Sequence, residues 1–160
     1  MRAAVLVPIY ESEDGLRVIM TRRPDDMPTH PGDVVFPGGM VDPGDEGPVD
    51  TAMREACEEI GLPRENVVEV LGGLTPTHTR SQTMVIVPVV ARVKRPETLV
   101  PEPREVAAIL EPAISELLDE ATWESREWSP GRHMWFREFS EGTLWGATAF
   151  MVRELLDYFR

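Results

Sequence analysis

The chain has 160 residues, of which 42% are hydrophobic and 28% are charged, and its formal net charge is −12. This length fits one domain with a substantial core, and the acidic balance argues against a surface that binds nucleic acid through its phosphates. The lone cysteine excludes an internal disulfide, and no apolar stretch is long enough to cross a bilayer. We therefore expect a single domain over residues 1–160, in the cytoplasm, without a nucleic-acid or membrane partner.

Short strands are predicted in the first part of the chain. Residues 2–10 and 16–23 are apolar runs separated by turn-forming residues, which predicts a pair of strands. Residues 24–32 contain three prolines and are predicted to form a loop, and residues 33–36 a short strand. A polar loop follows from residue 37 to residue 48.

A helix is predicted next, from Pro48 or Asp50 to Ile60. Asp50 is a candidate N-cap, and Gly61 followed by Pro63 indicates the end of the helix. The helix carries a small apolar stripe that can pack on a sheet, formed by Ala52, Ala56 and Ile60.

The remaining elements complete an α+β pattern. Residues 67–74 and 84–93 are rich in β-branched side chains and are predicted to be strands. Residues 114–123 are predicted to form a short helix, residues 133–139 a strand, and residues 144–159 an amphipathic helix. This order predicts helices packed on both sides of a mixed sheet.

Three carboxylates share one face of the predicted central helix. Glu58 and Glu59 lie three and four residues after Glu55, so their side chains project about one helical turn from that of Glu55. Without a counterion they repel, and a hard divalent cation such as Mg²⁺ would relieve the repulsion. Arg54 lies four residues before Glu58 and can hold its carboxylate, and a backbone carbonyl at Gly39 is a further candidate ligand. The alternative is an ordinary solvated acidic face.

This stretch resembles the Nudix box. Residues 54–62 match the Arg-Glu, Glu-Glu and Gly positions of the box, and seven residues separate Glu46 from Arg54 as the box requires. Six residues, rather than five, lie between Gly39 and Glu46, an extension similar to that of the coenzyme A pyrophosphatase branch. Residues 19–24, 30–39, 103–106 and 145–149 also resemble landmarks of that branch, with Pro24 in place of a serine and Asp33 in place of a glutamine.

The resemblance implies a Nudix fold and Mg²⁺- or Mn²⁺-dependent hydrolysis of a diphosphate bond in a small nucleotide derivative. The leading candidate is coenzyme A or acyl-coenzyme A, cleaved to 3′,5′-ADP and a 4′-phosphopantetheine. Glu55 and Glu59 are then the principal metal ligands, and Glu58 is a third ligand or the group that activates water. Glu105, in a proline-flanked loop, is the rival for activating water.

The substrate's phosphates have three candidate partners, Arg22, Arg23 and His30, and His30 can equally brace a turn. Two alternatives stay open. One is a Nudix enzyme for ADP-ribose or another nucleotide-sugar or dinucleoside diphosphate, and the other is a non-catalytic Nudix-like binding module. The presence of Glu55, Glu58 and Glu59 argues against the second alternative. A homodimer is compatible with the sequence.

Overall fold

The computed structural model describes residues 1–78 and 83–160. Its largest sheet has the strand order β2-β1-β8-β6, with β5 paired to β1 and β7 paired to β8. Strands β1 and β8 are parallel and the other pairs are antiparallel, so the predicted mixed sheet is confirmed. The strands of this sheet are β1 (Arg2–Ser12), β2 (Gly15–Val18), β5 (Gly38–Met40), β6 (Val67–Gly73), β7 (Thr77–His78) and β8 (Val85–Val93).

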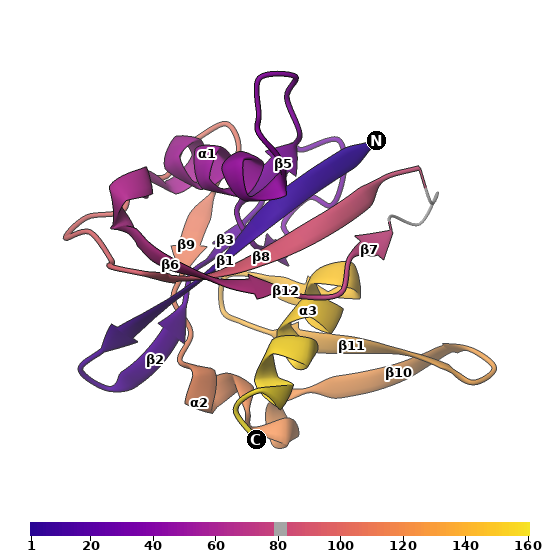
Figure 1. Cartoon of the computed structure of the whole chain (residues 1–160). Helices are drawn as coiled ribbons and strands as arrows, with labels where there is room; N and C mark the ends of the chain where they lie inside the picture. The colour runs from indigo at the N-terminus through magenta and orange to yellow at the C-terminus, as the bar shows by residue number, and fades with distance from the viewer. Residues whose placement is uncertain (79–82) are drawn as a thin grey trace.

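Two three-stranded sheets, β4-β3-β9 and β10-β11-β12, accompany the main sheet within the described residues. The hairpin of β10 and β11 projects from the body of the molecule (Figure 1). The strands of these sheets are β3 (Met20–Arg22), β4 (Val34–Val35), β9 (Ala108–Leu110), β10 (Glu124–Ser129), β11 (Arg132–Glu138) and β12 (Thr143–Trp145).

Two longer helices, α1 (Pro48–Ile60) and α3 (Gly146–Asp157), lie on opposite sides of the main sheet, as Figure 1 shows. The arrangement predicted from the order of elements is therefore confirmed. Over residues 1–78 and 83–160, no helix is long and apolar enough to span a membrane. The short helices are η1 (Arg64–Asn66), α2 (Ile114–Leu117) and η2 (Glu120–Thr122).

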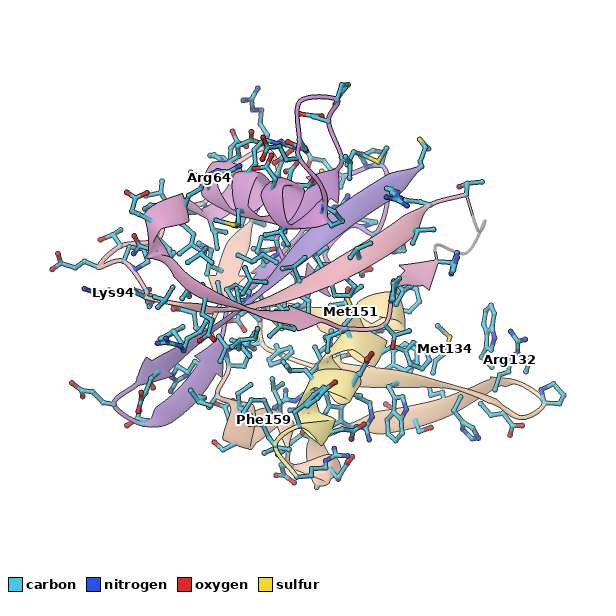
Figure 2. The ribbon with its side chains drawn as sticks, in the orientation of Figure 1. Arg64, Lys94, Arg132, Met134, Met151 and Phe159 are labelled. Atoms are coloured by element: carbon cyan, nitrogen blue, oxygen red, sulfur yellow. The ribbon has the colours of Figure 1, made fainter. Side chains whose placement is uncertain are left out.

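Strand β1 contributes to the core on each side of the sheet, because successive side chains of a strand point to opposite faces. Ala4, Leu6 and Tyr10 pack in the core that contains the predicted apolar stripe of α1. Val7 and Ile9 pack in the core that contains the buried side of α3. Figure 2 shows side chains filling both spaces. Because both faces of β1 are packed, the strand is held in place, and so are the neighbouring β5 and α1.

The prediction of one strand over residues 16–23 is wrong. Strand β2 ends at Val18 and β3 begins at Met20, and the intervening Ile19 donates its backbone N–H to the Pro8 carbonyl (3.0 Å). Val18 pairs with β1, whereas Met20 pairs with β9. The chain therefore passes from one sheet to another within a continuous apolar run, and the run itself contains no signal of that change.

The predictions for the C-terminal part need three further corrections. Residues 114–123 form two separate turns, α2 and η2, rather than one helix. The last helix begins at Gly146, because the residues before it form β12 and pair with β11. The segment Glu124–Ser129 is a strand that was not predicted, since its side chains are mostly polar and exposed.

Candidate active site

The helix α1 begins at Pro48, with Gly47 as the N-cap, so the prediction of Asp50 as the N-cap is wrong. The ring of Pro48 already fixes a helical φ at the first position. Asp50 lies in the first turn, where its carboxylate accepts a hydrogen bond from the Glu46 N–H (2.9 Å). Arg64, labelled beside α1 in Figure 2, also donates to Asp50.

The end of α1 carries the predicted glycine signal. Gly61 adopts a left-handed conformation with φ +67°, and its N–H donates to the Cys57 carbonyl (3.1 Å). A side chain is disfavoured at this φ, which is why glycine fits the position. A built Cβ would also lie 3.3 Å from Val100. The chain therefore turns sharply at this point and leaves the last carbonyls of the helix available to other segments.

The loop that carries Glu105 binds those carbonyls. The Val100 N–H donates to the Ile60 carbonyl (2.9 Å), and the Glu102 N–H donates to the Glu59 carbonyl (2.8 Å). The loop then turns on itself, with the Val106 N–H bonded to the Glu102 carbonyl (2.8 Å), and Val106 is buried in the core beneath α1. Backbone hydrogen bonds and one apolar anchor thus place Glu105 next to Glu59.

Strand β5 supports the two helix carboxylates from the other side. The Gly38 N–H donates to Glu59 Oε2 (2.9 Å). Gly39 lies against Glu55, because a Cβ built on Gly39 would be only 2.5 Å from Glu55 Oε1. A Cβ on Gly38 would lie 2.4 Å from the Ala4 carbonyl oxygen in β1. The two glycines therefore let the strand pass between β1 and the helix without side chains in the way.

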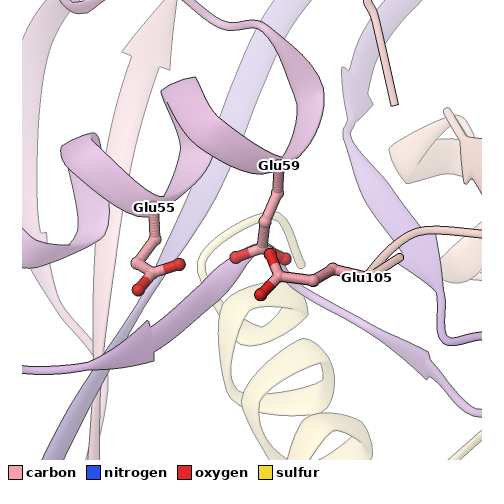
Figure 3. A group of neighbouring side chains, drawn as sticks. All are labelled: Glu55, Glu59 and Glu105. Atoms are coloured by element: carbon pink, nitrogen blue, oxygen red, sulfur yellow. The ribbon is translucent and has the colours of Figure 1, made fainter. Parts of the chain in front are cut away.

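Glu55, Glu59 and Glu105 converge in space (Figure 3). One carboxylate oxygen from each lies within 4.8 Å of the others. Burial, followed by the charge of Glu55, raises the pKa of Glu59 to about 9. Burial is also the largest cause of the raised pKa of Glu55. In the absence of a cation, the group therefore retains a proton that water-exposed carboxylates would lose.

These three residues suit a hard divalent cation. All three donors are carboxylate oxygens, which Mg²⁺ and Mn²⁺ prefer, and the set contains no nitrogen or sulfur ligand. The raised pKa values of Glu55 and Glu59 reflect burial and mutual repulsion that a cation would offset. Gly39, predicted as a carbonyl ligand, lies against Glu55 and pairs with Ala4 of β1.

Glu58 lies outside this group. Its side chain is 55% exposed, and both carboxylate oxygens accept hydrogen bonds from Arg54 Nη1 (3.3 Å). The same nitrogen also contacts Glu55 Oε1 (3.3 Å). The predicted pairing of Arg54 with Glu58 is thus present, and Arg54 additionally contacts a member of the carboxylate group.

Asp45 is a partner of Arg54 for which the sequence predicted no separate role. It accepts hydrogen bonds from Arg54 Nε (2.9 Å) and Nη2 (3.0 Å), and its side chain is only 4% exposed. The sequence signal for this role was weak, because Asp45 lies in a loop with other acidic residues. Its burial is evident only in three dimensions.

The candidate phosphate-binding residues lie on β3 and the loop after it. Arg22 forms an ion pair with Asp25 (2.5 Å), and its carbonyl accepts a hydrogen bond from the Ala107 N–H (2.8 Å), two residues beyond Glu105. Arg23 donates to the carbonyl (3.1 Å) and hydroxyl (3.2 Å) oxygens of Thr29. The backbone of β3 is therefore joined to the segment that carries Glu105, while both guanidinium groups already have partners in the chain.

His30 has a left-handed φ of +50°. Its Nδ1 lies 3.2 Å from Asp33 Oδ2, and its ring centroid lies 6.0 Å from that of Trp145. The ring is 62% exposed. These contacts fit the turn-bracing alternative, and the exposure leaves the ring accessible to a ligand.

The sequence matches the NUDIX domain family over residues 1–131. This chain belongs to the Nudix family. Nudix hydrolases act on diphosphate bonds of nucleotide derivatives and generally use divalent metals, so the chain is a Nudix pyrophosphohydrolase. Glu55, Glu59 and Glu105 form a carboxylate cluster of the kind that could hold such a metal.

Relatives and solved structures agree with the assignment to the Nudix family. The Nudix hydrolase NudL of Photorhabdus laumondii is 35% identical over 157 residues, which cover 96% of this chain and 82% of the relative. NudL of Enterobacter sp. (strain 638) is 36% identical over 158 residues, with 96% and 80% coverage. The crystal structure of the Nudix hydrolase RenU from M. smegmatis has a TM-score of 0.60 at 26% identity and covers 73% of each chain.

The NUDIX domain of Shewanella oneidensis NrtR, solved with ADP ribose, is similar in fold over the whole of this chain. Its TM-score is 0.61 at 14% identity, and the match covers 100% of this chain and 88% of that one. At this identity the likeness supports the Nudix fold alone.

Proposed function

We propose that this Nudix enzyme hydrolyses coenzyme A or acyl-coenzyme A to 3′,5′-ADP and a 4′-phosphopantetheine. The observation that carries the proposal is the pair Arg22 and Arg23, which occupies the position of the branch motif in an otherwise acidic chain. The backbone bond between Arg22 and Ala107 joins this pair to the segment of Glu105. Phosphate-binding arginines near the cleavage site would suit a substrate that has a third phosphate besides its diphosphate.

In this proposal, Glu55 and Glu59 hold Mg²⁺ or Mn²⁺, and Glu105, which lies in the same group, either completes the ligand set or activates water. The cation would neutralise diphosphate oxygens and activate a water molecule. Glu59 must lose its retained proton before it can act as a ligand, and the Gly38 N–H fixes the orientation of its carboxylate. Arg54 orients Glu58 and makes one longer contact with Glu55, both through its Nη1 nitrogen.

A second substrate class is favoured by one specific observation. Arg22 is paired with Asp25 and Arg23 with Thr29, and Pro24 and Asp33 depart from the branch motif. If these pairs persist when the substrate binds, neither Arg22 nor Arg23 is left for an additional phosphate. The substrate would then be ADP-ribose or another nucleotide-sugar or dinucleoside diphosphate.

A release assay on coenzyme A, dephospho-coenzyme A and ADP-ribose, with Mg²⁺ or Mn²⁺, separates the two classes. We expect kcat/KM for coenzyme A to exceed that for dephospho-coenzyme A by about tenfold or more, the effect of one charge-assisted contact. Arg22→Gln or Arg23→Gln should reduce this preference. Arg92→Gln, which removes an arginine that is 57% exposed on β8, should not change it.

Excess chelator should abolish turnover of every substrate in the assay. A kcat/KM for ADP-ribose well above both coenzyme A values would contradict the coenzyme A assignment and favour the second class. Full turnover in excess chelator would instead contradict the proposed cation site.

A further inference from the structure

Arg54 is surrounded by four carboxylates from two segments. Asp42 and Asp45 come from the loop before α1, and Glu55 and Glu58 come from α1 itself. Only Asp45 binds the guanidinium through two nitrogens, Nε and Nη2, with each of its oxygens taking one bond. The remaining nitrogen, Nη1, makes longer contacts of 3.3 Å with Glu55 and Glu58. The guanidinium is therefore drawn mainly toward the loop.

The geometry of Asp45 is itself fixed. Its Oδ2 accepts hydrogen bonds from the Thr51 hydroxyl (2.8 Å) and from the Asp42 N–H (2.9 Å). Thr51 is completely buried, and the Asp45 side chain is 4% exposed, whereas that of Asp42 is 61% exposed. The hydrogen bond from Arg54 holds the pKa of Asp45 well below its usual range, so this carboxylate remains charged at neutral pH.

The Glu55 carboxylate lies near two competing interaction partners. It lies in the group with Glu59 and Glu105, and it also contacts the guanidinium of Arg54. A guanidinium released from Asp45 would move toward the nearest carboxylates, of which Glu55, with 14% of its side chain exposed, is the more buried and the less screened by water. A closer ion pair there than the present contact of 3.3 Å would compete with a cation.

We propose that Asp45 is a positioning residue that limits Arg54 to a single longer contact with Glu55 and so keeps the rest of the Glu55 carboxylate available to a divalent cation. The inference rests on the cation site of the proposed function. The adjacent Glu46 is exposed, and its N–H donates to Asp50, so the loop is oriented with Asp45, not Glu46, toward the guanidinium.

The test is the affinity of the metal-free chain for Mn²⁺, measured by electron paramagnetic resonance of free Mn²⁺ without any substrate. Asp45→Asn should raise the Kd by about tenfold or more, the usual effect of losing a group that orients a metal ligand. The matched control is Asp42→Asn, which removes the same charge from the same loop at an exposed site 3.4 Å from Arg54 Nη2. Its Kd should stay within about twofold of the wild type.

A double variant tests the competition directly. Adding Arg54→Gln to Asp45→Asn removes the released guanidinium, and the Kd should return to within about threefold of the wild-type value. A purely structural role for Asp45 gives the opposite result, because the double variant would then bind no better than Asp45→Asn. That result would overturn the inference.

Further outcomes separate the inference from the cation site. If the wild type binds Mn²⁺ and Asp45→Asn binds it equally well, the inference is wrong and the cation site stands. If the wild type does not bind Mn²⁺, both fail. If circular dichroism shows that Asp45→Asn does not fold, Thr51→Val is measured in its place. This variant removes one hydrogen bond to Asp45 and keeps the pair of Asp45 with Arg54. This variant should raise the Kd by a smaller factor, and an unchanged value would overturn the inference.

Discussion

The three glutamates of α1 have different environments because the helix packs between β5 and solvent. Glu59 is 7% exposed and bonded to Gly38, whereas the side chain of Glu58 is 55% exposed and bonded to Arg54. Glu55 and Glu59 are one helical turn apart and face the loop of Glu105. This difference in surroundings is what gives each carboxylate a separate candidate role.

The water-activating group can be assigned by comparing Glu58→Gln with Glu105→Gln, since each substitution preserves size and removes charge. Glu105 lies in the carboxylate group and Glu58 does not, so we expect Glu105→Gln to cause the larger loss of kcat. Replacing the group that activates water should lower kcat by about two to four orders of magnitude with little change in metal dependence. Replacing a metal ligand should instead give a variant whose activity recovers partly at higher metal concentration.

The comparison needs steady-state kinetics across a range of Mg²⁺ and Mn²⁺ concentrations. Glu59→Gln serves as the reference for a ligand, because its oxygen lies in the same group and is buried. If Glu58→Gln collapses kcat at saturating metal while Glu105→Gln stays near the wild type, Glu58 is the group that activates water.

At the scale of elements, the site depends on how closely β5 approaches α1. The contact requires a residue without a side chain at Gly39, because a methyl group there would overlap the Glu55 carboxylate. On its other edge, β5 pairs with β1, whose faces are buried in both cores, so β5 cannot retreat from the helix. The overlap would have to be relieved by moving Glu55.

We therefore expect Gly39→Ala to weaken Mn²⁺ binding by about tenfold or more, while the chain remains folded. The matched control is Gly44→Ala in the loop between β5 and α1, where a built Cβ meets nothing within 4 Å. Metal titration by calorimetry, with circular dichroism as the folding check, measures both variants. Equal affinities for the two variants would contradict the proposed contact.

Some of these elements could be predicted because their signals are local. The bounds of α1 follow from Pro48, whose ring fixes φ, and from Gly61, whose lack of a side chain permits the left-handed turn. The break at Ile19 could not be predicted, because it depends on which distant strands pair with each half of the run. The helix spacing predicted an acidic face, but Glu55, Glu58 and Glu59 fit that spacing equally, and only the position of β5 separates them. Likewise, the partnership of Asp45 with Arg54 needs the folded loop.

At the scale of the whole molecule, the carboxylate group brings together segments distant in the chain. Residues of α1 meet a loop about fifty residues later, and β5 joins them to the first strand. Folding therefore brings several carboxylates together in a partly buried place. The raised pKa values of Glu55 and Glu59 reflect how unfavourable it is to ionise them all there. Stability and metal binding should consequently depend on pH in a linked way.

The stability of the metal-free chain should fall as pH rises. The pKa of Glu59 is raised from 4.5 to about 9 in the folded chain. The stabilisation from its proton is therefore fully present below pH 4.5 and is lost as pH rises through about 9. Relative to Glu59→Gln, the Tm of the wild type in chelator should drop by more than about 3 °C between pH 5 and pH 9.

Differential scanning calorimetry of both chains at a series of pH values measures this effect. Saturating Mn²⁺ should remove most of the decrease, since a cation favours the ionised carboxylates. A wild-type Tm that rises relative to that of Glu59→Gln over this pH range in chelator would contradict the raised pKa.

The loop that carries Glu105 also has a consequence for how the enzyme can diversify. It is attached to α1 through the backbone N–H groups of Val100 and Glu102 and through the buried Val106, while the Arg104 side chain is 90% exposed. Exchange of Arg104 therefore leaves the attachment of the loop intact. A point substitution at this exposed position therefore leaves the neighbouring carboxylate in place, whereas an insertion between residues 102 and 106 would displace it.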